Sequence, residues 1–250
     1  MIMNLLSKLF KKKPPVTFWS ENEVINELYP IYPSKKHKRS WVKSCAAAYQ
    51  KYKDRSANSG KYTLLTAAKC PGIRNIMEAG YIVQTWCDIV IETKDGKYTA
   101  ETPEHMNSIL EQIDYKEGFV THFDMRYSPM RIPYGDNNFP AILKFKCPYT
   151  FEVQPGYELM ILPVAYDENP NFTACMGLTG GLNPNFNVHV YWHVKEGRVH
   201  IPAGTPLCQV IPVKTGFEVE TKELDEDARK RILKKEFDMN NTFTRGGSSW

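Results

Sequence analysis

The sequence predicts a mainly β protein of the α+β class, with a β-sandwich or β-clip-like core, a mixed N-terminal segment and a C-terminal helix. Short apolar stretches alternate with Pro/Gly turns over residues 151–213. Residues 187–194 alternate with period two, and residues 221–237 carry a helical pattern. With 250 residues and 42% hydrophobic content, the chain can bury a substantial core in one large or two modest domains.

Four segments follow from these patterns. Residues 1–15 form a basic amphipathic arm, and residues 16–79 mix helical and extended stretches. Residues 80–215 form the β core, and residues 216–250 carry the C-terminal helix and a polar tail that we expect to be mobile.

The N-terminal arm does not read as a signal peptide, because its apolar residues precede its charges. It is also shorter than the roughly 20 residues that span a bilayer. Five apolar residues share one helical face: Ile2, Leu5, Leu6, Leu9 and Phe10. The arm therefore either docks onto a membrane or partner, or packs locally.

Two helices are expected in the mixed segment. Ser20 would cap a helix over residues 21–28, and Glu23 would complete a capping box. A second helix is expected over residues 40–52, where four side chains share a face: Trp41, Cys45, Ala48 and Tyr52.

The β core begins with a period-two pattern from Tyr81 to Ile91. Asp95-Gly96 is a strong hairpin turn signal. Residues 143–147 then alternate as a half-buried strand, and residues 159–164 are apolar on both faces, as in a central strand.

The clearest strand is the stretch 187–194. Its apolar face holds Val188, Val190, Trp192 and Val194, and its polar face holds His189, Tyr191 and His193. Glu196-Gly197 is expected to close a hairpin into a strand ending at Ile201, and the last strand covers residues 207–213. In the C-terminal helix, acids fill the first half and bases the second, which matches the helix dipole.

Charge and cysteine content restrict which partners, metal ions and cellular compartments we expect. A net charge of +4 without a basic, aromatic-lined stripe does not argue for nucleic acid. Lysine clusters near residues 8–13 and 35–43 are either solvated faces or contacts for an anionic partner. None of the six cysteines lies in a Cys-x-x-Cys pair, which favours free thiols in a reducing cytosol over zinc ligation.

The polar face of the 187–194 strand is the main candidate ligand-binding surface. At about 3.3 Å per strand residue, the imidazoles of His189 and His193 are about 13 Å apart, so they cannot share one ion. They can line one groove with Tyr191 between them.

An alternative metal site starts from the His122-Phe-Asp124 triplet. Together with His189 or His193, and with a later Arg198, its order resembles the motif of non-haem iron, 2-oxoglutarate-type oxygenases. That resemblance implies an Fe(II) cofactor with 2-oxoglutarate. No nucleophile elbow, Walker loop or dinucleotide fingerprint occurs, so a binding protein without a cofactor is favoured over an enzyme.

Residues 151–213 resemble the dUTPase-like β-clip family. Pro155-Gly-Tyr157 is similar to that family's turn, and Gly204-Thr-Pro-Leu-Cys-Gln209 is similar to its last strand. Gly204 and Gln209 are the positions that carry over as ligand-binding residues. Gly177-Leu-Thr-Gly180 has glycine where the catalytic aspartate belongs, so the resemblance implies the shape, with nucleotide binding as an alternative function, and not the hydrolysis.

Most of the chain resembles an uncharacterised family of tailed, marine-type bacteriophages. Segments that carry this resemblance include Lys69-Cys-Pro-Gly-Ile-Arg74, Lys146-Cys-Pro-Tyr149 and Tyr191-Trp-His193. It implies a phage product in the host cytoplasm or the virion. We expect a non-enzymatic homo-oligomer that binds other virion proteins or a small anionic ligand.

Overall fold

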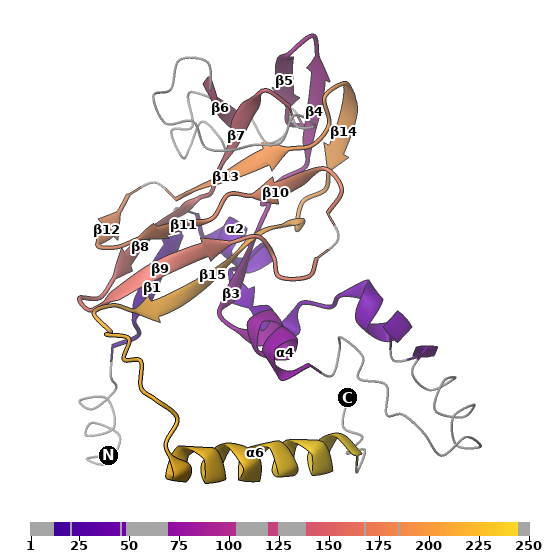
Figure 1. Ribbon diagram of the computed structural model, residues 1–250. Coiled ribbons are helices and arrows are strands. Elements are labelled where there is room, and N and C mark those ends of the chain that lie inside the picture. Colours follow the sequence, from indigo (N-terminus) through magenta and orange to yellow (C-terminus); the bar gives the residue numbers. More distant parts are fainter. Residues whose placement is uncertain are drawn as a thin grey trace, which may run out of the picture. The chain divides into compact units, whose positions relative to one another are not determined.

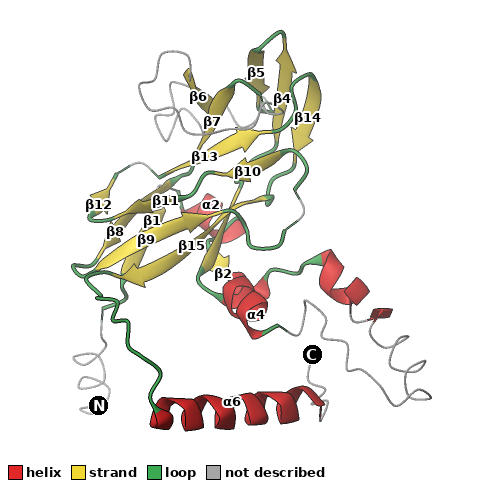
Figure 2. Ribbon diagram, in the orientation of Figure 1, coloured by secondary structure: helices red, strands yellow, loops and turns green. Residues whose placement is uncertain are grey.

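The computed structural model describes residues 13–20, 22–45, 47–48, 70–103, 120–124, 139–167, 169–184 and 186–244. The chain divides into two compact units. The β unit comprises Met1–His37 and Met77–Thr215, and the second unit comprises Lys38–Ile76 and Gly216–Trp250. Strands dominate the β unit (Figure 2), so the mainly β class is confirmed.

Within the described residues the strands form four antiparallel sheets (Figure 1). Sheet A has the order β1-β8-β12, with β1 Val16–Ser20, β8 Tyr149–Val153 and β12 Leu182–Asn183. Sheet B has the order β11-β9-β15-β3-β2, with β11 Gly177–Thr179, β9 Tyr157–Leu162, β15 Pro206–Lys214, β3 Tyr81–Gln84 and β2 Tyr32–Pro33. The strands β1 and β2 therefore bring residues before position 80 into the β unit.

The other two sheets are smaller. Sheet C has the order β14-β4-β5, with β14 Gly197–Ile201, β4 Ile89–Lys94 and β5 Lys97–Glu101. Sheet D has the order β10-β13-β7-β6, with β10 Phe172–Ala174, β13 Asn187–Trp192, β7 Ala141–Lys146 and β6 Val120–Asp124.

The hairpin predicted at Asp95-Gly96 is confirmed. It joins β4 to β5, and both turn residues have positive φ, 50° for Asp95 and 70° for Gly96. Two left-handed residues in succession are what a two-residue hairpin turn of the primed type requires.

The hairpin predicted at Glu196-Gly197 is wrong. Strand β14 pairs with β4, not with β13. Both edges of β13 are already taken, by β10 and by β7, so the chain has to leave sheet D for sheet C. The segment between β13 and β14 is held to β4 by a hydrogen bond, in which the Thr93 hydroxyl donates to the carbonyl of Val194 at 2.9 Å.

The single period-two face predicted from Tyr81 to Ile91 is also wrong. The chain breaks after Gln84 and resumes at Ile89, so the stretch supplies β3 to one sheet and β4 to another. Ile82 and Val83 are both fully buried, which shows that β3 is covered on both faces.

Helices are few in the described residues. α2 covers Glu23–Leu28, and its cap is Asn22, whose side chain accepts from the Ile25 amide, so the prediction of Ser20 as cap is wrong. The 3-10 turn η1 covers Ser34–Lys36, and α4 covers Pro71–Glu78. Residues 40–45 and 47–48 are helical where a helix was predicted, and the rest of that prediction lies outside the described residues.

The C-terminal helix is confirmed as α6, Glu226–Thr244, although it begins later than predicted. Asp225 caps it, because its carboxylate accepts from the Ala228 amide at 2.6 Å. In the described part of the chain, no helix is long and apolar enough to cross a membrane.

One cluster of buried apolar side chains draws on all four sheets. Its largest fully buried members are Trp86, Trp192, Phe145, Phe151 and Phe186. Phe151 and Phe186 meet edge to face at 5.3 Å between ring centroids, a favourable arrangement for aromatic rings. This shared core fixes the sheets of the β unit on one another.

Candidate functional site

Strand β13 separates apolar from polar side chains as predicted. Val188, Val190 and Trp192 are fully buried, whereas His189 and Tyr191 are half-buried. Because successive strand residues face opposite ways, the two polar residues share the other face of sheet D.

The pairing of β13 adds neighbours that the sequence did not identify. β13 runs between β10 and β7 (Figure 1). Thr173 on β10 pairs with Tyr191, and Lys144 on β7 pairs with His189. Cys175 follows β10, and its amide donates to the His189 carbonyl at 2.7 Å. We call Lys144, Thr173, Cys175, His189, Tyr191 and His193 the β13 face.

Side chains of the β13 face bond to one another. The Thr173 hydroxyl and Nε2 of His193 are 2.7 Å apart. The side chains of Cys175 and Tyr191 are also hydrogen-bonded. These contacts orient the groups while the face stays only partly buried.

Burial keeps this face uncharged apart from its lysine. It lowers the pKa of His189, with the nearby Lys144 as a second cause, and it lowers the pKa of His193. It raises the pKa of Cys175 to about 11, and it raises that of Tyr191, where Cys175 adds to the effect. Near neutral pH the face therefore presents neutral imidazoles, a thiol and a phenol beside one cation.

This electrostatic state favours binding over covalent chemistry. A thiol with a pKa of about 11 is almost entirely protonated near pH 7, and the thiolate is the nucleophilic form. Neutral hydroxyl and imidazole groups can instead donate and accept hydrogen bonds.

The alternative iron site lies partly outside the described side chains. In the backbone register, His122 pairs with Leu143 and Asp124 with Ala141, whereas His189 pairs with Lys144. The side chains of His122 and Asp124 are not among those the structure describes, so this site stays a prediction. Among the described side chains, no three His, Cys, Asp or Glu residues form a group that could hold a metal ion.

Gln209 and Gly204 lie away from the β13 face. Gln209 is fully buried in sheet B, where its side chain accepts from the Ala165 amide at 3.1 Å and donates to the Ala79 carbonyl at 2.6 Å. Gly204 forms the turn between β14 and β15 with a φ of +84°. The structure therefore does not bring these two residues together with His189, Tyr191 and His193.

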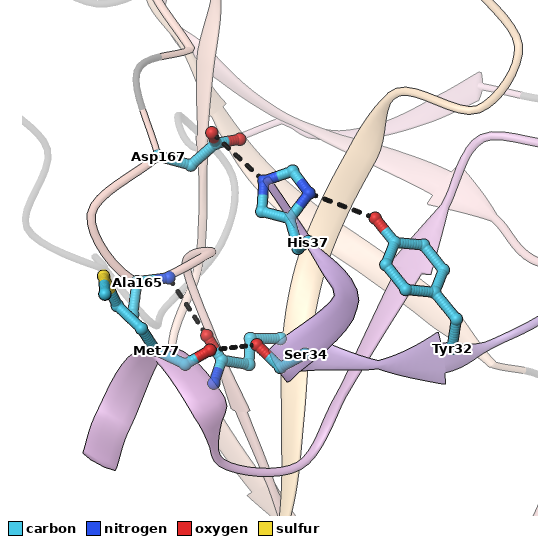
Figure 3. A network of polar contacts seen from close by, with 7 residues as sticks. Tyr32, Ser34, His37, Met77, Ala165 and Asp167 are labelled. Carbon is cyan, nitrogen blue, oxygen red and sulfur yellow. Dashed lines mark hydrogen bonds and ion pairs between the residues drawn. The ribbon is translucent and has the colours of Figure 1, made fainter. Parts of the chain in front are cut away.

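Gln209 belongs to a second group with Tyr32, Ser34, His37 and Asp167, which we call the buried polar cluster after its two fully buried members, Gln209 and Ser34. Figure 3 shows His37 between Tyr32 and Asp167, with ring-nitrogen distances of 3.2 Å to the Tyr32 hydroxyl and 3.3 Å to the carboxylate. The Ser34 hydroxyl donates to the Met77 carbonyl at 2.6 Å. This cluster ties residues 32–37 to segments more than forty positions away in sequence.

Sequence reasoning missed half of the β13 face. The alternation around Lys144 predicted its strand, but only the pairing of β7 with β13 sets it beside His189. Comparison with known proteins adds no further residue, because no family model and no curated protein matches this chain.

Proposed function

We propose that this protein acts by binding a small anionic ligand at the β13 face, without catalysing a reaction. One observation carries the proposal: five neutral hydrogen-bonding side chains gather on one half-buried surface beside Lys144. A partly buried cation with oriented neutral donors suits a carboxylate or phosphate group.

The neighbours of Lys144 favour a small ligand over an extended polyanion. In its described part, this side of sheet D offers two lysines on β7, Lys144 opposite His189 and Lys146 opposite Asn187, and not a long row of basic residues. Long polyanions are bound through several Lys and Arg contacts. The phage origin, in the host cytoplasm or virion, belongs to the same proposal and rests on the resemblance described above.

A thermal-shift panel tests the proposal with inorganic phosphate, nucleotides and dicarboxylates. A ligand at about 100 times its Kd stabilises the folded state by about 2.7 kcal/mol, which raises Tm by several degrees. Lys144→Gln should abolish the shift. The matched control is Lys97→Gln, which changes an exposed lysine in another sheet and should keep the shift.

Two results would contradict the proposal. A flat panel with all these anions would leave the β13 face without a ligand of the proposed class. A shift that requires Fe(II) and 2-oxoglutarate together, and is removed by a chelator, would favour the oxygenase alternative instead.

A further inference from the structure

A cavity of about 320 Å³ is lined by residues of sheets A and B, and none of its lining residues belongs to sheet D, which carries the β13 face. Two apolar side chains, Leu159 and Val210, and the ring of Tyr149 lie buried at its floor. The Tyr149 hydroxyl donates to the Tyr29 carbonyl at 3.1 Å, so it is already satisfied. Val16 and Phe18, both on β1, form one wall.

The mouth of the cavity differs from its floor. Asn26 on α2 and Tyr81 on β3 line the cavity and are exposed to solvent. In the described part of the chain, neither the carboxamide side chain of Asn26 nor the Tyr81 hydroxyl is hydrogen-bonded to another residue. The cavity thus combines an apolar interior with two polar groups at its opening that are available to a ligand.

Volume and lining together define the ligand class. An apolar cavity of about 150 Å³ accepts benzene, so one of roughly twice that volume accepts a two-ring aromatic molecule or an alkyl chain of similar size. We propose that this cavity binds a small, mainly apolar molecule that carries one polar group, which hydrogen-bonds to Asn26 or Tyr81 at the mouth. Ligand sites of this kind are concave and mostly apolar, with few orienting polar groups.

The experiment is a fluorescence titration of the full chain with N-phenyl-1-naphthylamine, whose emission rises in apolar surroundings. The wild-type protein should bind this neutral probe with a Kd on the order of 10 μM, given its size. Its single N–H group can donate to the Asn26 side-chain oxygen or the Tyr81 hydroxyl.

Substitutions at the mouth separate the cavity from other surfaces. Asn26→Trp places a bulky ring over the opening and should weaken probe binding about tenfold or more. Glu27→Trp is the matched control, since it adds the same ring to the next exposed position of α2, outside the cavity lining. Its Kd should stay within about twofold of the wild-type value, since its ring does not occupy the cavity.

A second pair of substitutions, one in the cavity wall and one beside it, tests the same site. Val16→Trp should abolish probe binding, whereas Thr17→Trp changes the next residue of β1, on the opposite face of the strand. Competition with naphthalene and 1-naphthol tests the polar group, because Tyr81→Phe combined with Asn26→Leu should weaken 1-naphthol selectively.

Clear results would overturn the proposal. The cavity is not a ligand site if the wild-type protein does not increase the fluorescence of the probe. The same holds if the Asn26→Trp variant binds the probe as tightly as the Glu27→Trp variant does. Asn26→Trp and Glu27→Trp both change exposed positions of α2, so these two variants can be compared even if Val16→Trp fails to fold. The Lys144→Gln variant should bind the probe normally, which distinguishes this site from the β13 face.

Discussion

The β13 face and the buried polar cluster use similar side chains in different ways. Both contain histidine, tyrosine and a hydroxyl residue, and both lie in the β unit. Both also contain bonds between side chains: His37 bonds to Tyr32 and Asp167, and Thr173 bonds to His193. In the buried polar cluster, however, Gln209 and Ser34 bond to backbone groups of Ala79, Ala165 and Met77.

That difference separates groups that stabilise the fold from groups that can meet a ligand. A buried backbone N–H or C=O that loses its partner costs about 1–3 kcal/mol. Ser34 and Gln209, the two fully buried members of the buried polar cluster, should therefore be intolerant of change. Side chains of the β13 face should be replaceable with small effects on stability and large effects on binding.

The largest expected loss of folding stability is at Gly80, where two backbone segments next to the buried polar cluster approach each other closely. Gly80, whose carbonyl accepts from the Ser34 amide, has a φ of +65°, and an added Cβ would lie 2.0 Å from the Val210 carbonyl oxygen. Gly80→Ala must displace sheet B backbone, so we expect a loss of about 4 kcal/mol or more in the free energy of unfolding.

Gly156→Ala is the matched control for that substitution. Gly156 also has a positive φ, +83°, but nothing lies within 4 Å of its added Cβ. It should cost only the left-handed backbone penalty of about 1–2 kcal/mol in urea unfolding. Equal losses for the two variants would mean that the close approach at Gly80 is unimportant.

Gln209→Met should have the next largest effect. The thioether has a similar length but leaves the Ala165 amide and the Ala79 carbonyl without their partner, which predicts a loss of about 3 kcal/mol. Gln154→Met, at a half-buried position between β8 and β9, should change stability by about 0.5 kcal/mol at most. A Gln209→Met protein as stable as wild type, measured by urea unfolding, would contradict the structural role of this amide.

Gln209 also shows which features of the structure cannot be predicted from the sequence. The alternation of β13 and the Asp95-Gly96 turn depend on neighbouring residues, so the sequence predicts both correctly. The role of Gln209 depends on Ala79, 130 positions away, and on Ala165, 44 positions away. A motif resemblance placed Gln209 in a ligand site because sequence carries no signal for either contact.

The prediction that β14 forms a hairpin with β13 was wrong for a related reason. Glu196-Gly197 is a sound local turn signal, but the occupied edges of β13 direct the chain to β4. The members of the β13 face from β7 and β10 were missed in the same way. Local pattern predicts strands and their faces, whereas the choice of neighbour depends on the whole sheet.

The smallest expected effect is the pH dependence of stability on the β13 face. Burial, with Lys144 as the second cause, holds the pKa of His189 below its ordinary value in the folded state. As pH falls below about 6.5, the unfolded chain therefore binds the proton first, and folding stability is lost. His189→Gln should make the decline between about pH 6.5 and 5 shallower in urea titrations at several pH values.

His200→Gln provides the comparison for this pH series, because His200 lies on β14 and its side chain is 57% exposed. It should leave the decline as steep as in the wild-type protein. An unchanged decline in the His189→Gln variant would show that burial of this imidazole does not affect folding.

The most direct test of the central claim is an NMR titration of histidine-labelled protein with inorganic phosphate at pH 7.5. The imidazole signals of His189 and His193, assigned with His→Gln variants, should shift saturably and with one common Kd. The signals of His37, in the buried polar cluster, and of the exposed His200 should stay in place. If His189 and His193 do not respond, or respond no more than His200, the β13 face is not the anion-binding surface.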